Sequence, residues 1–195
     1  HKTLNRLSLE QCAEYYQSLG AAGSVEEIVK ELSACALNGY RTRVREKPQA
    51  KEFLELLKEN RVPIAIATAS NREAVLLDLE HLGMLSLVDC LVTCDEVGKS
   101  KESPDIFLYC AEKLGAAAKE SVVFEDSAYA IRTAKNAGFP VVAVEDQVSI
   151  HGETPLETKE GIASMANLYV RDYGELISRL APAEDLSLGL GDLLG

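Results

Sequence analysis

Apolar residues recur at helical spacing in the first part of the chain. After Ser24 they fall on one face of a helix, at Val25, Ile28, Val29, Leu32 and Ala36. Ser24 and Glu27 fit a capping box, in which a hydroxyl and a later side chain satisfy free backbone amides, and so do Ser8 and Gln11. Glycines between these two segments indicate a turn. The pattern predicts a helical hairpin over residues 1–46.

From Pro48 onward, short apolar runs alternate with amphipathic segments. The runs have the length and continuity of strands buried on both faces, and they lie at residues 62–67, 90–93, 121–124, 140–144 and from 168 onward. The segments between them carry helical spacing, at about residues 50–57, 75–82, 104–114 and 128–137, with a last helix that reaches Leu180. This alternation predicts an α/β fold with a parallel sheet between two layers of helices over residues 47–180. Residues 181–195 show no clear period and are expected to form a C-terminal tail.

Composition narrows the functional classes. The chain has 195 residues, 47% of them hydrophobic, and a formal net charge of -11. That charge argues against nucleic acid or an anionic membrane as a partner, because both require a clustered basic surface. Five scattered cysteines without a CxxC pair argue against a zinc site or a disulfide framework. We therefore expect a cytoplasmic globular protein, and the sequence leaves its oligomeric state open.

Ligands of parallel α/β sheets bind at the carboxyl ends of the strands. After the first run come Thr68, Ser70 and Asn71, whose hydroxyls and amide could cradle a phosphate at a helix N-terminus or could simply cap that helix. After the third run come Glu125 and Asp126, which could bind Mg²⁺ through their oxygens. The alternative for this acidic pair is a helix cap at Asp126 or Ser127.

A lysine ahead of the 104–114 helix could neutralise the charge of a phosphate. Lys101 and Lys99 are the two candidates, and the alternative for each is an ordinary surface lysine. None of these pieces decides the function by itself.

Taken together, the order and spacing of the pieces resemble motifs two, three and four of the haloacid-dehalogenase superfamily. The residues that carry the resemblance are Ala67-Thr68-Ala69-Ser70-Asn71, Lys101-Glu102-Ser103-Pro104-Asp105-Ile106-Phe107 and Val122-Val123-Phe124-Glu125-Asp126-Ser127. Within that superfamily the chain looks like the subgroup that contains β-phosphoglucomutase and phosphatases of small phosphates. The resemblance implies a Rossmann-like three-layer core, with residues 1–46 forming part of a small α-helical cap.

The resemblance also implies a role for each candidate residue. Thr68 would hydrogen-bond the transferring phosphoryl group, with Ser70 and Asn71 as further phosphate donors. Lys101 would stabilise the charge on the phosphoryl oxygens. Asp126 would bind Mg²⁺, and Glu125 would be a second ligand or a partner behind it. The implied activity is a Mg²⁺-dependent phosphohydrolase that acts on a small phosphorylated metabolite through an aspartyl-phosphate intermediate.

One motif of the superfamily is missing from residues 1–195. Its nucleophile is the first aspartate of an Asp-x-Asp segment on a strand between those that precede Thr68 and Glu125, and no such segment occurs here. We expect that strand upstream of His1, a slot between the two strands, and no activity from residues 1–195 alone. Two alternatives stay open: a phosphomutase of the β-phosphoglucomutase type, and a non-catalytic module that binds a phosphorylated ligand.

Overall fold

The computed structural model describes residues 9–43, 45–150 and 154–180, with the backbone alone for residues 36–43. By its internal contacts the chain divides into two compact units, residues 1–45 and residues 46–195. Each unit is built around its own contacts.

The first unit is a helical hairpin. Helix α1 (Leu9–Ser18) packs against helix α2 (Val25–Arg43). The predicted capping box at the start of α2 is confirmed: the Glu27 amide donates to Ser24 Oγ at 3.2 Å, and the Ser24 amide donates to the Glu27 carboxylate at 2.8 Å. Ser8, which begins the other predicted box, lies outside the described residues.

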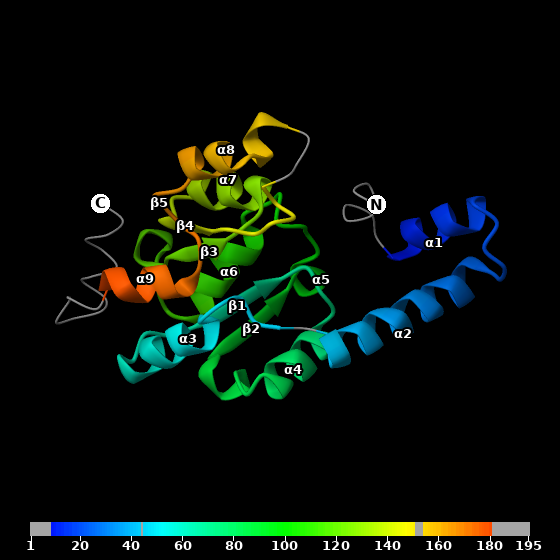
Figure 1. The fold of residues 1–195 in the computed structure, drawn as a ribbon, viewed down its shortest axis with the longest axis horizontal. Helices are drawn as coiled ribbons and strands as arrows, with labels where there is room; N and C mark the ends of the chain where they lie inside the picture. Colours follow the sequence, from blue (N-terminus) through cyan, green and yellow to red (C-terminus); the bar gives the residue numbers. More distant parts are fainter. Residues whose placement is uncertain (1–8, 44, 151–153, 181–195) are drawn as a thin grey trace. The chain divides into compact units, whose positions relative to one another are not determined.

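The second unit alternates strands and helices (Figure 1). Its strands are β1 (Ala65–Thr68), β2 (Cys90–Thr93), β3 (Val123–Glu125), β4 (Val141–Val144) and β5 (Leu168–Val170). Its helices are α3 (Ala50–Glu59), α4 (Arg72–His81), α5 (Cys94–Val97), α6 (Asp105–Lys113), α7 (Ala128–Asn136), α8 (Lys159–Met165) and α9 (Tyr173–Leu180). Short 3-10 helices lie at Leu85–Leu87, Ala118–Glu120 and Pro155–Glu157.

All strand pairs are parallel, as predicted, but they form two separate sheets. Strand β1 pairs with β2 from Ala65–Cys90 to Thr68–Thr93. Strands β3, β4 and β5 form the other sheet in that order, with Glu125 opposite Ala143. Within the described part of the chain β1 has no strand pairing to β3. The interruption falls where the sequence predicted a slot.

Hydrophobic cores on the two faces hold the sheets together. Successive residues of β4 are buried and alternate between the cores, because side chains of a strand point to opposite faces. One core contains Val141 and Ala143 together with the larger side chains of α6 and α7, namely Ile106, Phe107 and Ile131. The other contains Val142 and Val144 together with side chains of α3 and α9, namely Phe53, Leu57, Leu176 and Leu180. Residues in β1 or directly before it also pack into both cores. The two cores, with their helices, therefore connect the two sheets.

Two differences from the predicted elements have physical causes. Strand β1 begins at Ala65 rather than at Val62 because Arg61 is left-handed, Pro63 has no amide hydrogen, and the Ile64 amide donates to the Asp89 carboxylate at 2.9 Å. Helices α5 and α8 were not predicted. They span only Cys94–Val97 and Lys159–Met165, too short to show an apolar period.

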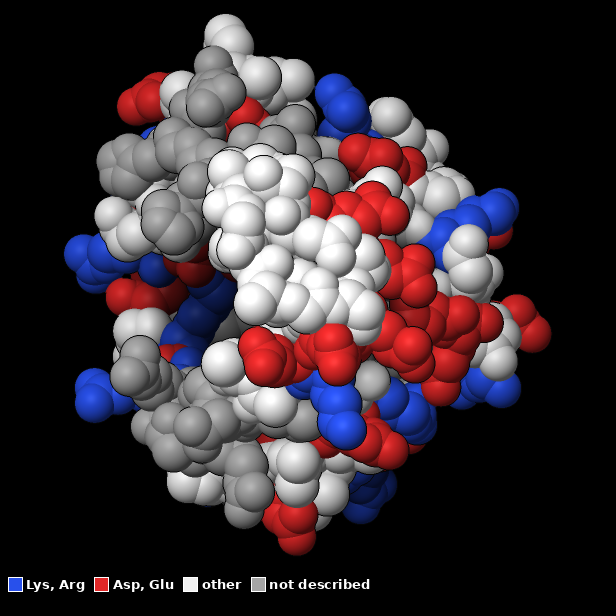
Figure 2. All heavy atoms as spheres, turned by 90° about the vertical axis from the view of Figure 1, so that its right-hand side faces the viewer, with Lys and Arg blue, Asp and Glu red and all other residues white. Residues whose placement is uncertain are grey.

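No helix within the described ranges is both long and apolar enough to cross a membrane. Acidic side chains cover more of the face shown in Figure 2 than basic ones do, as the formal net charge of -11 leads one to expect.

Candidate active site

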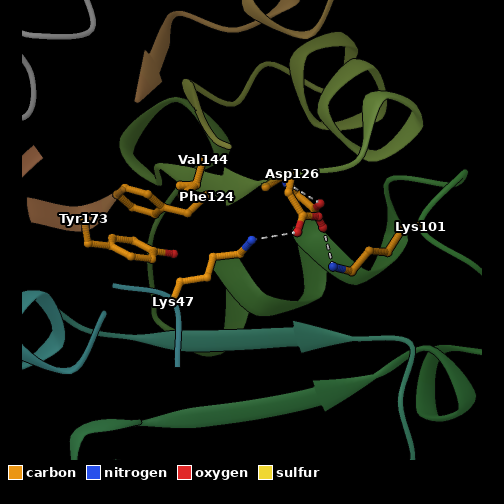
Figure 3. Close-up of a pocket in the computed structure, with 7 residues that line it drawn as sticks. Lys47, Lys101, Phe124, Asp126, Val144 and Tyr173 are labelled. Atoms are coloured by element: carbon orange, nitrogen blue, oxygen red, sulfur yellow. Dashed lines mark hydrogen bonds and ion pairs between the residues drawn. The ribbon is translucent and has the colours of Figure 1, made fainter. Parts of the chain in front are cut away.

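A pocket of about 170 Å³ opens beside the carboxyl ends of β3 and β4 (Figure 3). Its lining combines cationic, acidic and aromatic side chains with one aliphatic residue: Lys47, Lys101, Phe124, Glu125, Asp126, Val144 and Tyr173. Charged groups and a small volume favour a small polar ligand over an apolar one.

Glu125, the last residue of β3, is buried, with 6% of its side chain exposed. Its Oε2 accepts the backbone amides of Asp126 at 3.0 Å and Ser127 at 3.2 Å. Those amides lie at the start of α7, where backbone donors have no partner within the helix. The alternative for this acidic pair was a helix cap at Asp126 or Ser127. Ser127 does occupy the cap position, but its side chain makes no cap hydrogen bond.

Lys101 approaches Glu125 from the segment between α5 and α6, and its ammonium pairs with Glu125 Oε1. Only 17% of the Lys101 side chain is exposed. Burial works against its charge, but the charge and hydrogen bond of Glu125 outweigh burial, so the pKa of Lys101 is raised. Lys99, the other candidate, instead pairs with Asp105 at 2.9 Å on the surface. Of the two lysines, only Lys101 lines the pocket.

Asp126 presents its carboxylate to the pocket (Figure 3). Its Oδ1 accepts the Ser127 hydroxyl at 3.2 Å, and its Oδ2 lies 3.4 Å from the Lys47 ammonium. Burial and the neighbouring charge of Glu125 raise the pKa of Asp126, while Lys47 works in the opposite direction. A further cation near this carboxylate would therefore stabilise its ionised form.

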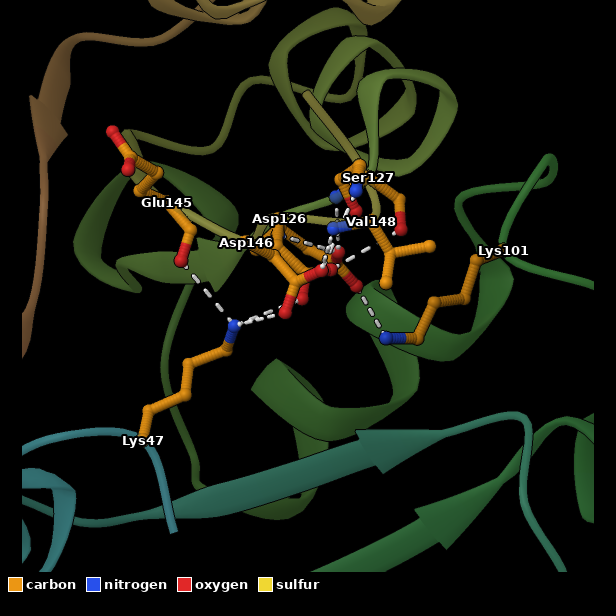
Figure 4. Close-up of polar contacts among 9 residues, drawn as sticks. Lys47, Lys101, Asp126, Ser127, Glu145, Asp146 and Val148 are labelled. Atoms are coloured by element: carbon orange, nitrogen blue, oxygen red, sulfur yellow. Dashed lines mark hydrogen bonds and ion pairs between the residues drawn. The ribbon is translucent and has the colours of Figure 1, made fainter. Parts of the chain in front are cut away.

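Lys47 and Asp146 belong to the site but were missed from the sequence. The Lys47 ammonium lies 2.7 Å from Asp146 Oδ2 and 3.4 Å from the carbonyl oxygen of Glu145 (Figure 4). A signal was available, because Glu145 and Asp146 follow β4 directly, as Glu125 and Asp126 end and follow β3. No sequence signal placed Lys47 at the site, because it precedes α3 rather than following a strand and lies 99 positions from Asp146.

Tyr173, at the start of α9, was also missed. Its hydroxyl points toward the Lys47 side of the pocket (Figure 3). Burial, with the charges of Asp126 and Glu125, raises its pKa to about 12. The phenol therefore stays protonated at neutral pH and is available as a hydrogen-bond donor.

The hydroxyl and amide candidates lie at the end of β1 and do not line this pocket. Thr68 Oγ1 accepts the Ser70 amide at 3.0 Å. Asn71 Oδ1 accepts the amides of Glu73 and Ala74 at 2.9 and 3.3 Å, which is the helix-capping alternative. The structure thus brings Lys101, Glu125 and Asp126 together, while Thr68 ends a strand of the other sheet and Ser70 and Asn71 follow that strand.

The acidic side chains provide limited metal-binding capacity. Within the part of the chain that the structure describes, no group of three or more His, Cys, Asp or Glu residues is arranged to hold a metal ion. Glu125 uses both oxygens on Lys101 and backbone amides, which leaves Asp126 as the carboxylate open to the pocket. Mg²⁺ is compatible with such a donor, since it often binds one or two carboxylates and takes its other ligands from water and substrate phosphate.

Comparison with known proteins identifies the family. Residues 2–144 match the sequence model of the haloacid dehalogenase-like hydrolases. The chain belongs to this family. Two curated relatives of this haloacid dehalogenase-like chain are phosphatases. It is 30% identical over 122 residues to the phosphorylated carbohydrates phosphatase of Thermotoga maritima, covering 63% of this chain and 56% of that protein. It is 32% identical over 133 residues to the validoxylamine A 7'-phosphate phosphatase of Streptomyces hygroscopicus subsp. limoneus, covering 68% and 62%.

Solved structures show the same haloacid dehalogenase-like fold. CbbY from Rhodobacter sphaeroides, crystallised with xylulose-(1,5)bisphosphate, superimposes with a TM-score of 0.71 at 17% identity, covering 90% of this chain and 77% of that one. The β-phosphoglucomutase of Clostridium difficile gives a TM-score of 0.65 at 18% identity, covering 89% and 75%. The chain spans 56% and 62% of the lengths of the two curated relatives.

Proposed function

We propose that the full-length protein is a Mg²⁺-dependent phosphohydrolase that acts on a small phosphorylated metabolite. The observation that carries this proposal is the buried Lys101–Glu125 ion pair beside the open carboxylate of Asp126, at the carboxyl end of β3. Family membership and the phosphatase names of the two relatives support it. The scattered cysteines suit a reducing compartment such as the cytoplasm.

In this proposal each residue of the chain has a defined task. Lys101, fixed by Glu125, holds a positive charge where negative charge develops on the phosphoryl oxygens. Asp126 binds Mg²⁺, and Glu125 orients Lys101 and the start of α7 behind it. When bound, the cation neutralises phosphoryl charge. Thr68, Ser70 and Asn71 would act as donors to the substrate phosphate from the end of β1.

The proposed nucleophile is the first aspartate of an Asp-x-Asp segment. Residues 1–195 contain no such segment. Its carboxylate would attack phosphorus in line and displace the alcohol, and water would then hydrolyse the resulting aspartyl-phosphate. The absence of pairing between β1 and β3 in the described residues supports a strand position between them for this aspartate.

Substitution of Asp126 in the full-length protein tests the proposal. We expect Asp126→Asn to reduce Mg²⁺-dependent phosphate release from an aryl phosphate by roughly 100-fold or more, because a charged ligand is lost. The matched control is Asp95→Asn, which removes an exposed carboxylate from α5 and should leave the rate unchanged. Full activity of Asp126→Asn would contradict the metal assignment. Return of the phosphoryl group to a second sugar hydroxyl, rather than to water, would identify a phosphomutase, and phosphate-ester binding without turnover would identify a non-catalytic module.

A further inference from the structure

Lys47 reaches across the pocket to the acidic residues that follow two neighbouring strands. Its ammonium lies 2.7 Å from the Asp146 carboxylate and 3.4 Å from that of Asp126 (Figure 4). About a third of each side chain is exposed, at 33% for Lys47 and 31% for both aspartates. The lysine therefore sits between two carboxylates and is closer to Asp146.

The other acidic residues of this cluster are neutralised elsewhere. Glu125 pairs with Lys101. Glu145 accepts the Lys159 ammonium at 2.9 Å and the Tyr169 hydroxyl at 2.7 Å. Lys47 is thus the cation that the described structure places against Asp126 and Asp146.

A constrained turn fixes the position of Lys47. Its carbonyl accepts the Ala50 amide at 3.0 Å, and the following Pro48 restricts the backbone. Gln49 has φ 60 and ψ 23, a left-handed conformation that is unfavourable for residues other than glycine. The Gln49 side chain lies so close to Gly174 of α9 that a Cβ there would be 1.6 Å from its Oε1. Such strain persists only where the surroundings enforce it, so the turn holds Lys47 in place rather than leaving it free on the surface.

We propose that the Lys47 ammonium competes with the divalent metal ion for the Asp126 carboxylate. The ion pair of Lys47 with Asp146 weakens this competition, because it draws the ammonium away from Asp126. This inference rests on the proposed function, which assigns the metal ion to Asp126. An ammonium 3.4 Å from that carboxylate repels a second cation there. Because the contact to Asp146 is shorter, Lys47 can keep Asp146 when a metal ion takes Asp126. Lys47 then sets the affinity of the site for the metal ion without being a ligand.

Calorimetric titration of the metal-free, full-length protein with MgCl₂ tests this competition. We expect Lys47→Met to lower the Kd for Mg²⁺ by about three- to tenfold, because a nearby like charge is removed. Asp146→Asn should raise the Kd for two reasons. The negative charge of Asp146 no longer attracts the metal ion, and Lys47 then pairs with Asp126 alone. In the Lys47→Met background the effect of Asp146→Asn should shrink, since only the lost charge remains. Such non-additivity is the signature of coupled residues.

Lys58→Met is the matched control. It removes a lysine from an ion pair of similar exposure, Lys58–Asp89 at 2.5 Å, and should leave the Kd for Mg²⁺ unchanged. Thermal melting without Mg²⁺ checks that each variant is folded, and Lys47→Gln replaces Lys47→Met if the latter is not. An unchanged or raised Kd in the folded Lys47 variant overturns the inference while leaving the metal site standing. If Asp126→Asn binds Mg²⁺ as tightly as the unsubstituted protein, the metal assignment of the proposed function fails as well.

Discussion

Glu125 pairs with Lys101 through one carboxylate oxygen and accepts the two backbone amides just before α7 through the other. A single buried side chain therefore joins the lysine segment to the start of the helix. This arrangement fixes the direction in which Asp126, the next residue, can point. The ion pair and the open carboxylate are consequently two parts of one structural unit.

Substitution Glu125→Gln should destabilise the protein. It leaves the Lys101 ammonium, whose side chain is only 17% exposed, without its counter-charge. Removal of one partner from a buried ion pair costs on the order of 3 kcal/mol. The free energy of unfolding in urea measures this loss. In comparison, Lys58→Met breaks an exposed pair and should change stability by about 1 kcal/mol or less. Similar losses in the two variants would show that the Lys101–Glu125 pair is not effectively buried.

Lys101 and Lys99 should differ sharply in their effect on activity. We expect Lys101→Met to slow phosphate release by the full-length protein by roughly 100-fold, because a preorganised charge next to the phosphoryl group is lost. Lys99→Met removes a lysine two positions away that pairs with Asp105 on the surface, and should leave the rate within about twofold. Steady-state kinetics with an aryl phosphate measures both. Equal losses would refute the assignment of the phosphate-facing role to Lys101.

Protonation of Asp89 at acid pH should lower the free energy of unfolding. The hydrogen bonds from the Lys58 ammonium and the Ile64 amide lower its pKa. A carboxylate with a lowered folded-state pKa stabilises the protein fully above its unfolded value, about 3.9, and this contribution is lost as pH falls through the folded pKa. Asp89→Asn should therefore weaken the decline of unfolding free energy below about pH 4. Urea denaturation from pH 3 to 7 measures it, and superimposable curves would argue against this contribution.

Two helical glycines should respond differently to replacement by alanine. A Cβ at Gly161 of α8 would lie 2.2 Å from the Pro155 carbonyl oxygen and 2.7 Å from Leu156 Cα, so backbone must move. The atoms nearest to a Cβ at Gly174 of α9 would belong to side chains, of which Gln49 is the closest. Overpacking typically costs about 1–3 kcal/mol. We expect Gly161→Ala to lower thermal stability more than Gly174→Ala, despite the helix preference for alanine. The reverse order would mean that Gln49 is the less adaptable neighbour.

The sequence predicted the parallel α/β architecture because its strands are continuous apolar runs and its main helices show a clear period. It missed α5, although Thr93 and Glu96 form a capping box at its start, because Cys94–Val97 is too short for a periodic pattern. Glu125 and Asp126 could be predicted because they end and follow a strand, and strand ends in such sheets meet at one edge. Lys101 could be predicted as a lysine ahead of the 104–114 helix, at the place where the resemblance to the superfamily puts one. Lys47 could not, since its position depends on the left-handed turn at Gln49 and on packing against α9, which no local pattern encodes.

The interruption between the two sheets has a consequence for the behaviour of the isolated polypeptide in solution. Within the described residues, β1 bonds only to β2, and β3 only to β4 on one side. Each therefore presents an inner row of amides and carbonyls that can template a strand from another molecule. Residues 46–195 produced alone should therefore self-associate as concentration rises. Co-expression with a short β-forming peptide that fits between β1 and β3 should keep them monodisperse.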